Sequence, residues 1–251
     1  MQAIGKKMKT IILHYHLFKN AGTSLDAAFK ENFSEKSGEW VTKEFPGNPA
    51  KNRAELKQWI IDNPQARCFS SHTAFFPVPQ IEGVKIIPVV FVRHPIDRMA
   101  SAYSFEKKQG GDSFGPTLAR NTSVAGYIET RLSMQTDRQC RDFHANRFAT
   151  MFGEQQGDES TRAKMAVDAL PFIGVVEKYS QSLECLETLL ESHGFTGIKL
   201  KPVERNVSRS VKKTLPEKLE EIREQFSEES FNSLLEANKT DLEIWKTLYN
   251  G

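Results

Sequence analysis

The sequence predicts an α/β fold, in which a mostly parallel sheet is flanked by helices on both faces and the chain forms a single domain. Short apolar runs rich in β-branched residues alternate with amphipathic helical patterns, which is the arrangement that buries a parallel sheet between helices. The length of 251 residues suits one such domain. A hydrophobic content of 39% and a charged content of 26% are typical of a globular protein.

The first half of the chain is expected to begin with a buried strand at residues 9–16, which is rich in β-branched residues. A helix is expected at 24–33, because Leu25, Ala28 and Phe29 recur at helical spacing. The elements expected after it are a helix at 54–61, strands at 67–71 and 85–93, and a helix at 95–108 with Pro95 at its first position.

Two segments lack a clear pattern along their length. Residues 34–52 are polar and contain several glycines and prolines, so we expect a loop or an insertion there. Residues 112–160 show helical patterns only at 126–131 and 138–148, followed by a polar loop at 153–160. We expect this region to be a second insertion.

The last part of the chain again alternates between apolar runs and helical patterns. Leucines recur on one side of residues 180–192, and Gly194 follows as a helix cap. The expected elements are strands at 172–176 and 198–202, the helix at 180–192, and C-terminal helices within 214–251 at 216–226, 228–238 and around Leu242, Trp245 and Leu248.

The charge balance and the cysteines narrow the classes of protein. The formal net charge of +2 gives no general reason for nucleic-acid binding, so no nucleic-acid partner is expected. Cys68, Cys140 and Cys185 match no zinc or disulfide pattern, which favours a reducing compartment. The apolar run after the N-terminal lysines is too short for a signal peptide or a membrane span. We therefore expect a cytoplasmic protein without a membrane span.

An anion site is predicted at the carboxyl end of the first strand. The apolar run there ends in Lys19, and Gly22, Thr23 and Ser24 come just before a helical pattern. Backbone N–H groups at the start of a helix bind anions, and a lysine adds a full positive charge. In a Walker A loop the lysine follows the last glycine, whereas Lys19 precedes Gly22. The segment therefore indicates phosphate binding without ordinary ATP and Mg²⁺ chemistry.

A second anion site is predicted after the strand at 85–93. Arg93 ends that strand and can pair with a phosphate through two nitrogens. Ser101 lies in the following helix, and Arg98 is three residues before it, so the two are expected to share a helix face. The competing interpretation is that Arg93 forms a salt bridge at the end of the sheet and Ser101 is a surface residue.

Both segments resemble nucleotide-binding motifs of the sulfotransferases. Residues 16–25, His-Leu-Phe-Lys-Asn-Ala-Gly-Thr-Ser-Leu, are similar to the family's 5′-phosphosulfate loop, and Arg93 with Ser101 is similar to its 3′-phosphate motif. The resemblance spans roughly residues 10–210 and is closest to carbohydrate sulfotransferases of the heparan 2-O and 6-O type and their bacterial relatives. Two further segments fit the family, at residues 172–179 and 206–209.

The resemblance implies a P-loop-NTPase-like sulfotransferase domain over residues 1–251 that uses 3′-phosphoadenosine 5′-phosphosulfate (PAPS) as donor. Asn20 replaces the family's usual threonine and Phe18 its usual proline, but Asn20 keeps a backbone N–H for the phosphate. Residues 34–52 and 112–160 would form the acceptor region. The residues implied to hold the donor are Lys19, Asn20, Ala21, Gly22, Thr23 and Ser24 at the 5′ end, Arg93 and Ser101 at the 3′-phosphate, and Ser208 and Arg209 in a late loop over the nucleotide.

Lys19 is expected to neutralise charge on the leaving phosphate, and a histidine is expected to take the acceptor's proton. His16 resembles the base of some 6-O-type relatives, and His72 resembles the base of 2-O-type relatives; the sequence leaves both open, with a buried structural role as the alternative. His14 is expected to be structural and His144 a surface or packing residue. His14 and His16 alone, without a third carboxylate or thiol nearby, make a metal site a weak prediction, and none is expected.

Two other functions stay open at this point. One is a P-loop nucleotide kinase or NTPase, which would need Mg²⁺ and ATP. The other is a sulfotransferase-like module that binds nucleotide without turnover. The expected partners of the leading hypothesis are the nucleotide donor and a hydroxyl acceptor, which the resemblance suggests is an oligosaccharide or another alcohol.

Overall fold

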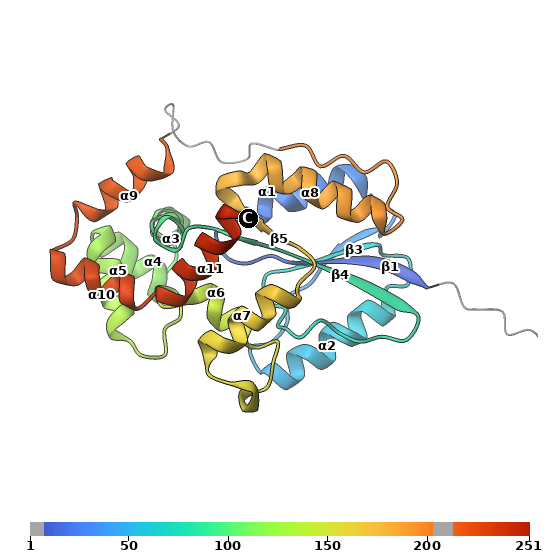
Figure 1. The fold of residues 1–251 in the computed structure, drawn as a ribbon, viewed down its shortest axis with the longest axis horizontal. Coiled ribbons are helices and arrows are strands. Elements are labelled where there is room, and N and C mark those ends of the chain that lie inside the picture. The colour runs from blue at the N-terminus through green and yellow to red at the C-terminus, as the bar shows by residue number, and fades with distance from the viewer. Residues whose placement is uncertain (1–7, 203–212) are drawn as a thin grey trace, which may run out of the picture.

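The computed structural model describes residues 8–202 and 213–251 of the chain (Figure 1). Its described part contains a five-stranded sheet in which every neighbouring pair of strands is parallel, so the predicted α/β fold is confirmed. Across the sheet, the strands are β2 (Trp40–Thr42), β3 (Cys68–Ser71), β1 (Lys9–Tyr15), β4 (Val84–Val92) and β5 (Ile173–Val175).

Helices cover both faces of the sheet. In the part of the chain that the structure describes, no helix is both long enough and apolar enough to cross a membrane. The α-helices are α1 (Gly22–Asn32), α2 (Pro49–Asp62), α3 (Pro95–Gln109), α4 (Phe114–Asn121), α5 (Val124–Ser133), α6 (Phe143–Ala149), α7 (Glu159–Ala169), α8 (Tyr179–Ser192), α9 (Leu215–Arg223), α10 (Glu228–Glu236) and α11 (Lys239–Asn250).

Side chains of β1 alternate between two separate cores, as expected for a strand with both faces covered. Ile11 and Leu13 belong to a core shared with α2, α6, α7 and α11. Ile12 belongs to the opposite core, where it packs with residues of α1 and α8. Figure 1 shows α1 and α8 on one side of the sheet and α2 and α7 on the other.

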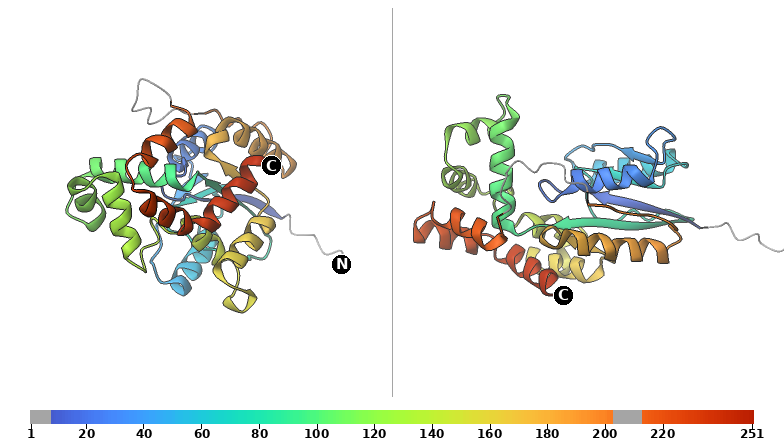
Figure 2. Two further views of the ribbon diagram at one scale, coloured as in Figure 1. Left: turned by 60° about the vertical axis from the view of Figure 1, so that its left-hand side comes forward. Right: turned by 90° about the horizontal axis from the view of Figure 1, so that it is seen from above.

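A third core lies beyond the carboxyl ends of the strands. It is formed by apolar residues of α3, α4, α5, α9 and α10, including Met99, Tyr127 and Leu234. These helices gather at the left of Figure 1, and Figure 2 shows them grouped at one end of the sheet. They therefore stand beside the edge at which parallel α/β sheets bind ligands.

The strand order places two loops together at that edge. β1 pairs with β3 on one side and with β4 on the other, with Tyr15 opposite Ser71 and Val90. The chain leaves β1 for β2 at one edge of the sheet, whereas it leaves β4 for β5 at the other. Ligands bind at such a reversal of strand order, and here it brings the segment after β1 next to the segment after β4.

The prediction that residues 34–52 form a loop is wrong in part. Trp40 pairs with Cys68 in the short strand β2, and α2 already begins at Pro49, with Asn48 Oδ1 accepting a hydrogen bond from the Lys51 N–H at 3.0 Å. A strand of three residues is too short to show a period-2 pattern. It forms because β3 offers a free edge for parallel pairing.

The region at 112–160 and the predicted strand at 198–202 also differ from the expectations. The region contains α4, α5 and α6, and α7 begins at Glu159, inside the predicted polar loop at 153–160. Residues 198–202 are not a strand. Their backbone donors are used by side chains instead, because Lys199 N–H donates to Asn32 Oδ1 at 2.9 Å and Leu200 N–H donates to Glu187.

Replacing Leu186 with alanine tests the core between the sheet and α8. Leu186 is fully buried there, whereas Leu189 on the same helix is only partly buried. We expect Leu186→Ala to lower the free energy of unfolding by about 2–5 kcal/mol, and Leu189→Ala to lower it clearly less. Urea denaturation of both variants measures this. Equal losses would contradict the packing described for α8.

Candidate active site

A cleft of about 1010 Å³ lies at the carboxyl edge of the sheet. The structure brings the two predicted anion sites together in it, because residues from the loop after β1 and from α3 line the same cavity. Both candidate bases also line it. The predicted site residues on its wall are His16, Lys19, Ala21, Gly22, Thr23, Ser24, His72, Arg93 and Ser101.

The loop between β1 and α1 has an unusual backbone. Lys19 and Ala21 adopt the left-handed region with φ of 64° and 59°, whereas Asn20 between them does not. Backbone of alternating hand turns successive N–H groups toward one point and forms an anion-binding concavity. Among the described residues, the N–H groups of Ala21, Gly22 and Thr23 have no acceptor, and they lie where α1 begins.

Asn20 differs from its expected role. Its backbone N–H, which was expected to serve the phosphate, donates to the carbonyl of Leu17 at 3.2 Å. Its side chain is buried and does not line the cleft. The side-chain nitrogen Nδ2 donates to the carbonyl of Phe18 at 3.0 Å, and Oδ1 accepts from His144 Nε2 at 2.9 Å. Asn20 therefore anchors the loop from behind.

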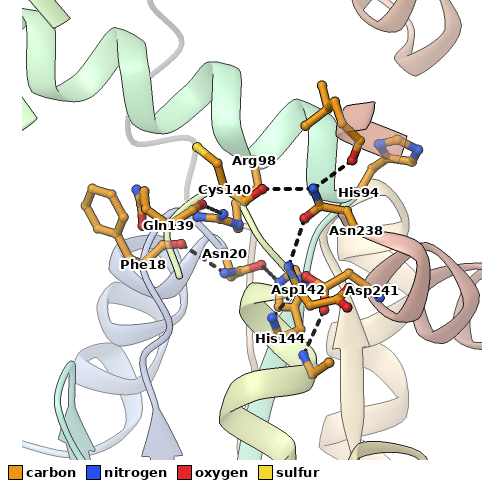
Figure 3. A network of polar contacts seen from close by, with 12 residues as sticks. Phe18, Asn20, His94, Arg98, Gln139, Cys140, Asp142, His144, Asn238 and Asp241 are labelled. Atoms are coloured by element: carbon orange, nitrogen blue, oxygen red, sulfur yellow. Dashed lines mark hydrogen bonds and ion pairs between the residues drawn. The ribbon is translucent and has the colours of Figure 1, made fainter. Parts of the chain in front are cut away.

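His144 is buried, so of the two roles expected from the sequence the surface role is wrong, and the residue belongs to a polar network that no motif indicated (Figure 3). Its Nδ1 donates to Asp241 Oδ2 at 2.9 Å. Asp241 is fully buried in α11 and also accepts from the backbone N–H groups of His144 and Ala145 at 3.0 and 2.7 Å. Burial alone would raise the pKa of Asp241, but these donors outweigh it and lower the pKa. Asp241 is therefore a carboxylate.

Further hydrogen bonds connect this network to Asn238, which lies between α10 and α11. Asp142, the N-cap of α6, accepts from the Asp241 N–H at 3.0 Å, and its own N–H donates to Asn238 Oδ1 at 3.1 Å. Asn238 Nδ2 donates to the carbonyls of Cys140 and Leu234, both at 2.9 Å. No sequence motif indicated these residues, because they lie more than a hundred positions from the loop they support.

Gly22 lies directly against the ring of His16. A Cβ atom added at Gly22 would come within 2.0 Å of His16 Cδ2 and 2.3 Å of Nε2. His16 cannot move away easily, because its Nδ1 donates to Asp26 Oδ2 at 2.9 Å and its side chain is buried. Only glycine fits at this close approach of backbone and ring.

Asp26 of α1 holds the two strand histidines in place. Its Oδ1 accepts from His14 Nδ1 and from Ser70 Oγ, both at 2.7 Å, and its Oδ2 accepts from His16. Burial would raise the pKa of Asp26, but the contacts with His14 and His16 outweigh it and hold the pKa well below the usual range. Burial is also the main reason why the pKa of His16 is lowered.

The sequence indicated no carboxylate near His14 and His16, but the structure places Asp26 there. Ligand-type atoms of the three residues lie within 4.8 Å of one another. Their Nδ1 atoms and carboxylate oxygens already bind each other through the hydrogen bonds given above. If a metal ion bound here, it would have to displace both bonds. The absence of a metal from the mechanism stays a prediction.

His72, in the segment after β3, is exposed to the cleft. Its ring centroid lies 3.7 Å from that of His16. Its backbone N–H donates to Glu44 Oε1 at 3.3 Å. The pKa of His72 is lowered mainly because part of the ring is buried. The charge of His16 is the second cause.

Arg93 lines the cleft and is held by a carboxylate. Its Nε and Nη2 both lie 2.6 Å from Asp97 Oδ2, and its Nη1 donates to the carbonyl of Lys19 at 3.5 Å. Lys218 of α9 approaches the same carboxylate at 3.9 Å. The salt bridge of the competing interpretation is therefore present, whereas pairing of Arg93 with a phosphate stays a prediction for a residue that lines the cavity.

The expectation that Arg98 and Ser101 share a face is wrong. Ser101 lines the cleft, whereas Arg98 is fully buried, donates to the carbonyl of Gln139 and lies 4.0 Å from the ring centroid of Phe143. Burial lowers the pKa of Arg98. A helix turns by 100° per residue, so residues three apart diverge by about 60°. α3 lies at the boundary between the cleft and the core, so this difference in direction leaves Ser101 on the cleft side and Arg98 on the core side.

Lys19 extends its ammonium over the ring of Phe105, 4.5 Å from the ring centroid. Burial and then the charge of Arg93 lower its pKa. The two cations stand side by side on the wall of the cleft and repel each other, so the site favours an anion between them. Ser208 and Arg209, which were expected to cover the nucleotide, lie outside the described residues.

Two comparisons bear on this site. The model of the sulfotransferase family matches residues 7–250, a span that includes both anion motifs and the C-terminal helices. An uncharacterized protein of Archaeoglobus fulgidus is 38% identical over 246 residues, which cover 95% of this chain and 95% of the relative. The match extends far beyond the two motifs that suggested the resemblance. We conclude that the chain belongs to the sulfotransferase family, whose enzymes transfer sulfuryl groups.

Proposed function

We propose that the protein transfers a sulfuryl group from PAPS to a hydroxyl of an acceptor, which is a carbohydrate or another alcohol. One observation carries the proposal. The free N–H groups at the start of α1 and the guanidinium of Arg93 line a single cleft, together with two histidines. A nucleotide with anionic groups at both its 5′ and 3′ positions matches two separate anion sites that share one cavity.

The donor's 5′-phosphosulfate is assigned to the loop. The N–H groups of Ala21, Gly22 and Thr23 point from a helix start and favour a phosphate there, and the hydroxyls of Thr23 and Ser24 lie on the same wall. The 3′-phosphate is assigned to Arg93 and Ser101. Asp97 fixes two nitrogens of Arg93, so the guanidinium keeps one orientation before the donor arrives.

Sulfuryl transfer forms a bond between the acceptor oxygen and sulfur while the bond between sulfur and the 5′-phosphate oxygen breaks. Negative charge grows on the departing phosphate, and the ammonium of Lys19 is available to stabilise it. In the free protein this ammonium rests on Phe105, a weak partner that an anion readily replaces. The acceptor's proton passes to a neutral imidazole.

The exposed ring of His72 supports it as the base. His16 is only 6% exposed, its Nδ1 is used by Asp26, and its Nε2 edge is covered by Gly22. The ring of His72 packs against that of His16 but is more exposed, and it also lines the cleft. We therefore assign proton transfer to His72, and to His16 the role of supporting both the loop and the ring of His72.

Thermal-shift measurements test the donor. Adenosine 3′,5′-bisphosphate at 100 times its dissociation constant is expected to stabilise the protein by about 2.7 kcal/mol, and AMP or ATP with Mg²⁺ much less at the same concentration. Arg93→Ala should remove the preference for the bisphosphate over AMP, because it removes the 3′-phosphate contact. Arg120→Ala, outside the cleft, should keep it. Equal stabilisation of the unmodified protein by AMP and by the bisphosphate would contradict the proposed donor.

The pH profile tests the base. His72 must be neutral to accept a proton, and its lowered pKa keeps it neutral at pH 7. We expect kcat/KM to be constant near neutrality and to fall only below the ordinary histidine range of about 6.5. His72→Asn should lower the rate by about 10²–10⁴ and remove this acid limb, whereas His16→Asn should keep it. An unchanged limb in His72→Asn would transfer the role to His16.

Gly22→Ala tests the contact between loop and ring. The new methyl group collides with the pinned ring of His16, so the loop must shift. We expect kcat/KM to fall about 100-fold, the effect of a displacement of about 1 Å at a reacting site. Gly47→Ala is the matched control, since nothing lies within 4 Å of its added Cβ. Similar kinetics in both variants would show that the loop does not rest on His16.

A further inference from the structure

We propose that Asn20, His144 and Asp241 form a clamp that holds the phosphate loop in its anion-binding shape, which makes His144 and Asp241 positioning residues for the donor. The proposal deepens the assignment of this loop to the 5′-phosphosulfate and rests on that assignment for its effect on binding. Its structural part concerns the loop alone and holds without any ligand. The three residues are called the loop clamp below.

The loop needs support because of its sequence. The left-handed conformations of Lys19 and Ala21 are disfavoured for residues with a Cβ atom, and glycine is the residue that adopts them freely. This chain uses no glycine at either position. A conformation of this kind persists only where surrounding contacts determine it. Asn20 stands between the two disfavoured residues and is the one whose side chain enters the protein interior.

Hydrogen-bond roles fix the direction of every group in the clamp. The carbonyl of Phe18 can only accept, so the Asn20 amide must point its NH₂ group there and its oxygen toward His144. That oxygen also only accepts, so His144 Nε2 carries a hydrogen. Asp241 is a carboxylate that already takes two backbone N–H groups, so His144 Nδ1 carries a hydrogen as well. In this geometry both ring nitrogens of His144 face groups that accept hydrogen bonds.

The clamp is buried along its length, which makes it rigid. Asn20 and His144 are each 1% exposed and Asp241 is 0% exposed. Water cannot replace these bonds, and a charge-assisted bond in a dry site is stronger than one at the surface. Figure 3 shows how the clamp connects the loop to α6 and to the start of α11. The C-terminal helix therefore acts on the start of α1 through three side chains.

Amide hydrogen exchange of the full-length, ligand-free protein tests the clamp itself. Asn20→Ala should speed exchange at residues 24 and 25 by about tenfold or more, because their N–H groups donate to the carbonyl of Ala21 and the loop opens locally. Adding Ala21→Gly should reduce that increase, because glycine removes one of the two disfavoured conformations. Asn32→Ala is the control, since the side chain of this asparagine in α1 makes three hydrogen bonds, against two for Asn20, but lies outside the loop. It should leave exchange at residues 24 and 25 unchanged.

Binding of adenosine 3′,5′-bisphosphate, measured by calorimetry, tests the positioning role. We expect Asn20→Ala to weaken binding about tenfold more when residue 21 is alanine than when it is glycine, a coupling that a general loss of stability would not produce. Asp241→Asn, which keeps the shape of the side chain and does not touch the cleft, should weaken binding with the same dependence on residue 21. It serves in place of Asn20→Ala where the latter does not fold.

The outcomes separate the two levels of the proposal. Unchanged loop exchange in both Asn20→Ala and Asp241→Asn, or losses that do not depend on residue 21, would overturn the clamp. Failure of the unmodified protein to bind the bisphosphate would overturn the donor assignment, and the exchange experiment would still decide the clamp.

Discussion

The parallel pairing of β1 with β4 is the constraint on which the site depends. Because Tyr15 lies opposite Val90, the two strands end side by side and their loops must share one edge of the sheet. This brings Lys19 and Arg93 together although 73 positions of sequence separate them. Asp97 compensates the charge of Arg93, but among the described residues no carboxylate pairs with Lys19. The sheet therefore builds a place where positive charge is left for an anion to neutralise.

The second constraint is the backbone of the loop. P-loops obtain their anion-binding shape from glycines, which reach left-handed conformations without steric cost. Here only Gly22 is a glycine, and it is required for a different reason, namely the close approach to His16. The shape at Lys19 and Ala21 must come from outside the loop. This explains why a buried polar network, which costs desolvation, sits directly behind it.

The sequence was informative where the signal is local. The order of strand, loop and helix around Lys19, and the strand expected at 85–93, followed from apolar runs and turn residues, and the structure has both, with β4 ending at Val92. β2 escaped prediction because three residues carry no periodicity, and it exists only through its pairing with β3. The burial of Arg98 and the inward turn of Asn20 depend on partners far along the chain. Rules based on residue spacing cannot identify such distant partners, so the sequence did not indicate that His144 and Asp241 support the loop.

Two histidine–aspartate pairs contact the loop between β1 and α1, one from each face of the sheet. Asp26 and His16 belong to the face covered by α1 and reach the loop at Gly22, while Asp241 and His144 belong to the face covered by α6 and α11 and reach it at Asn20. In each pair the carboxylate fixes the imidazole, and the imidazole fixes one loop residue. An imidazole held by a carboxylate at Nδ1 can still accept a proton at Nε2, but in both pairs the Nε2 side lies against a loop residue, which is Asn20 for His144 and Gly22 for His16. His72 is more exposed to the cleft than either of these histidines, which supports its proposed role as the base.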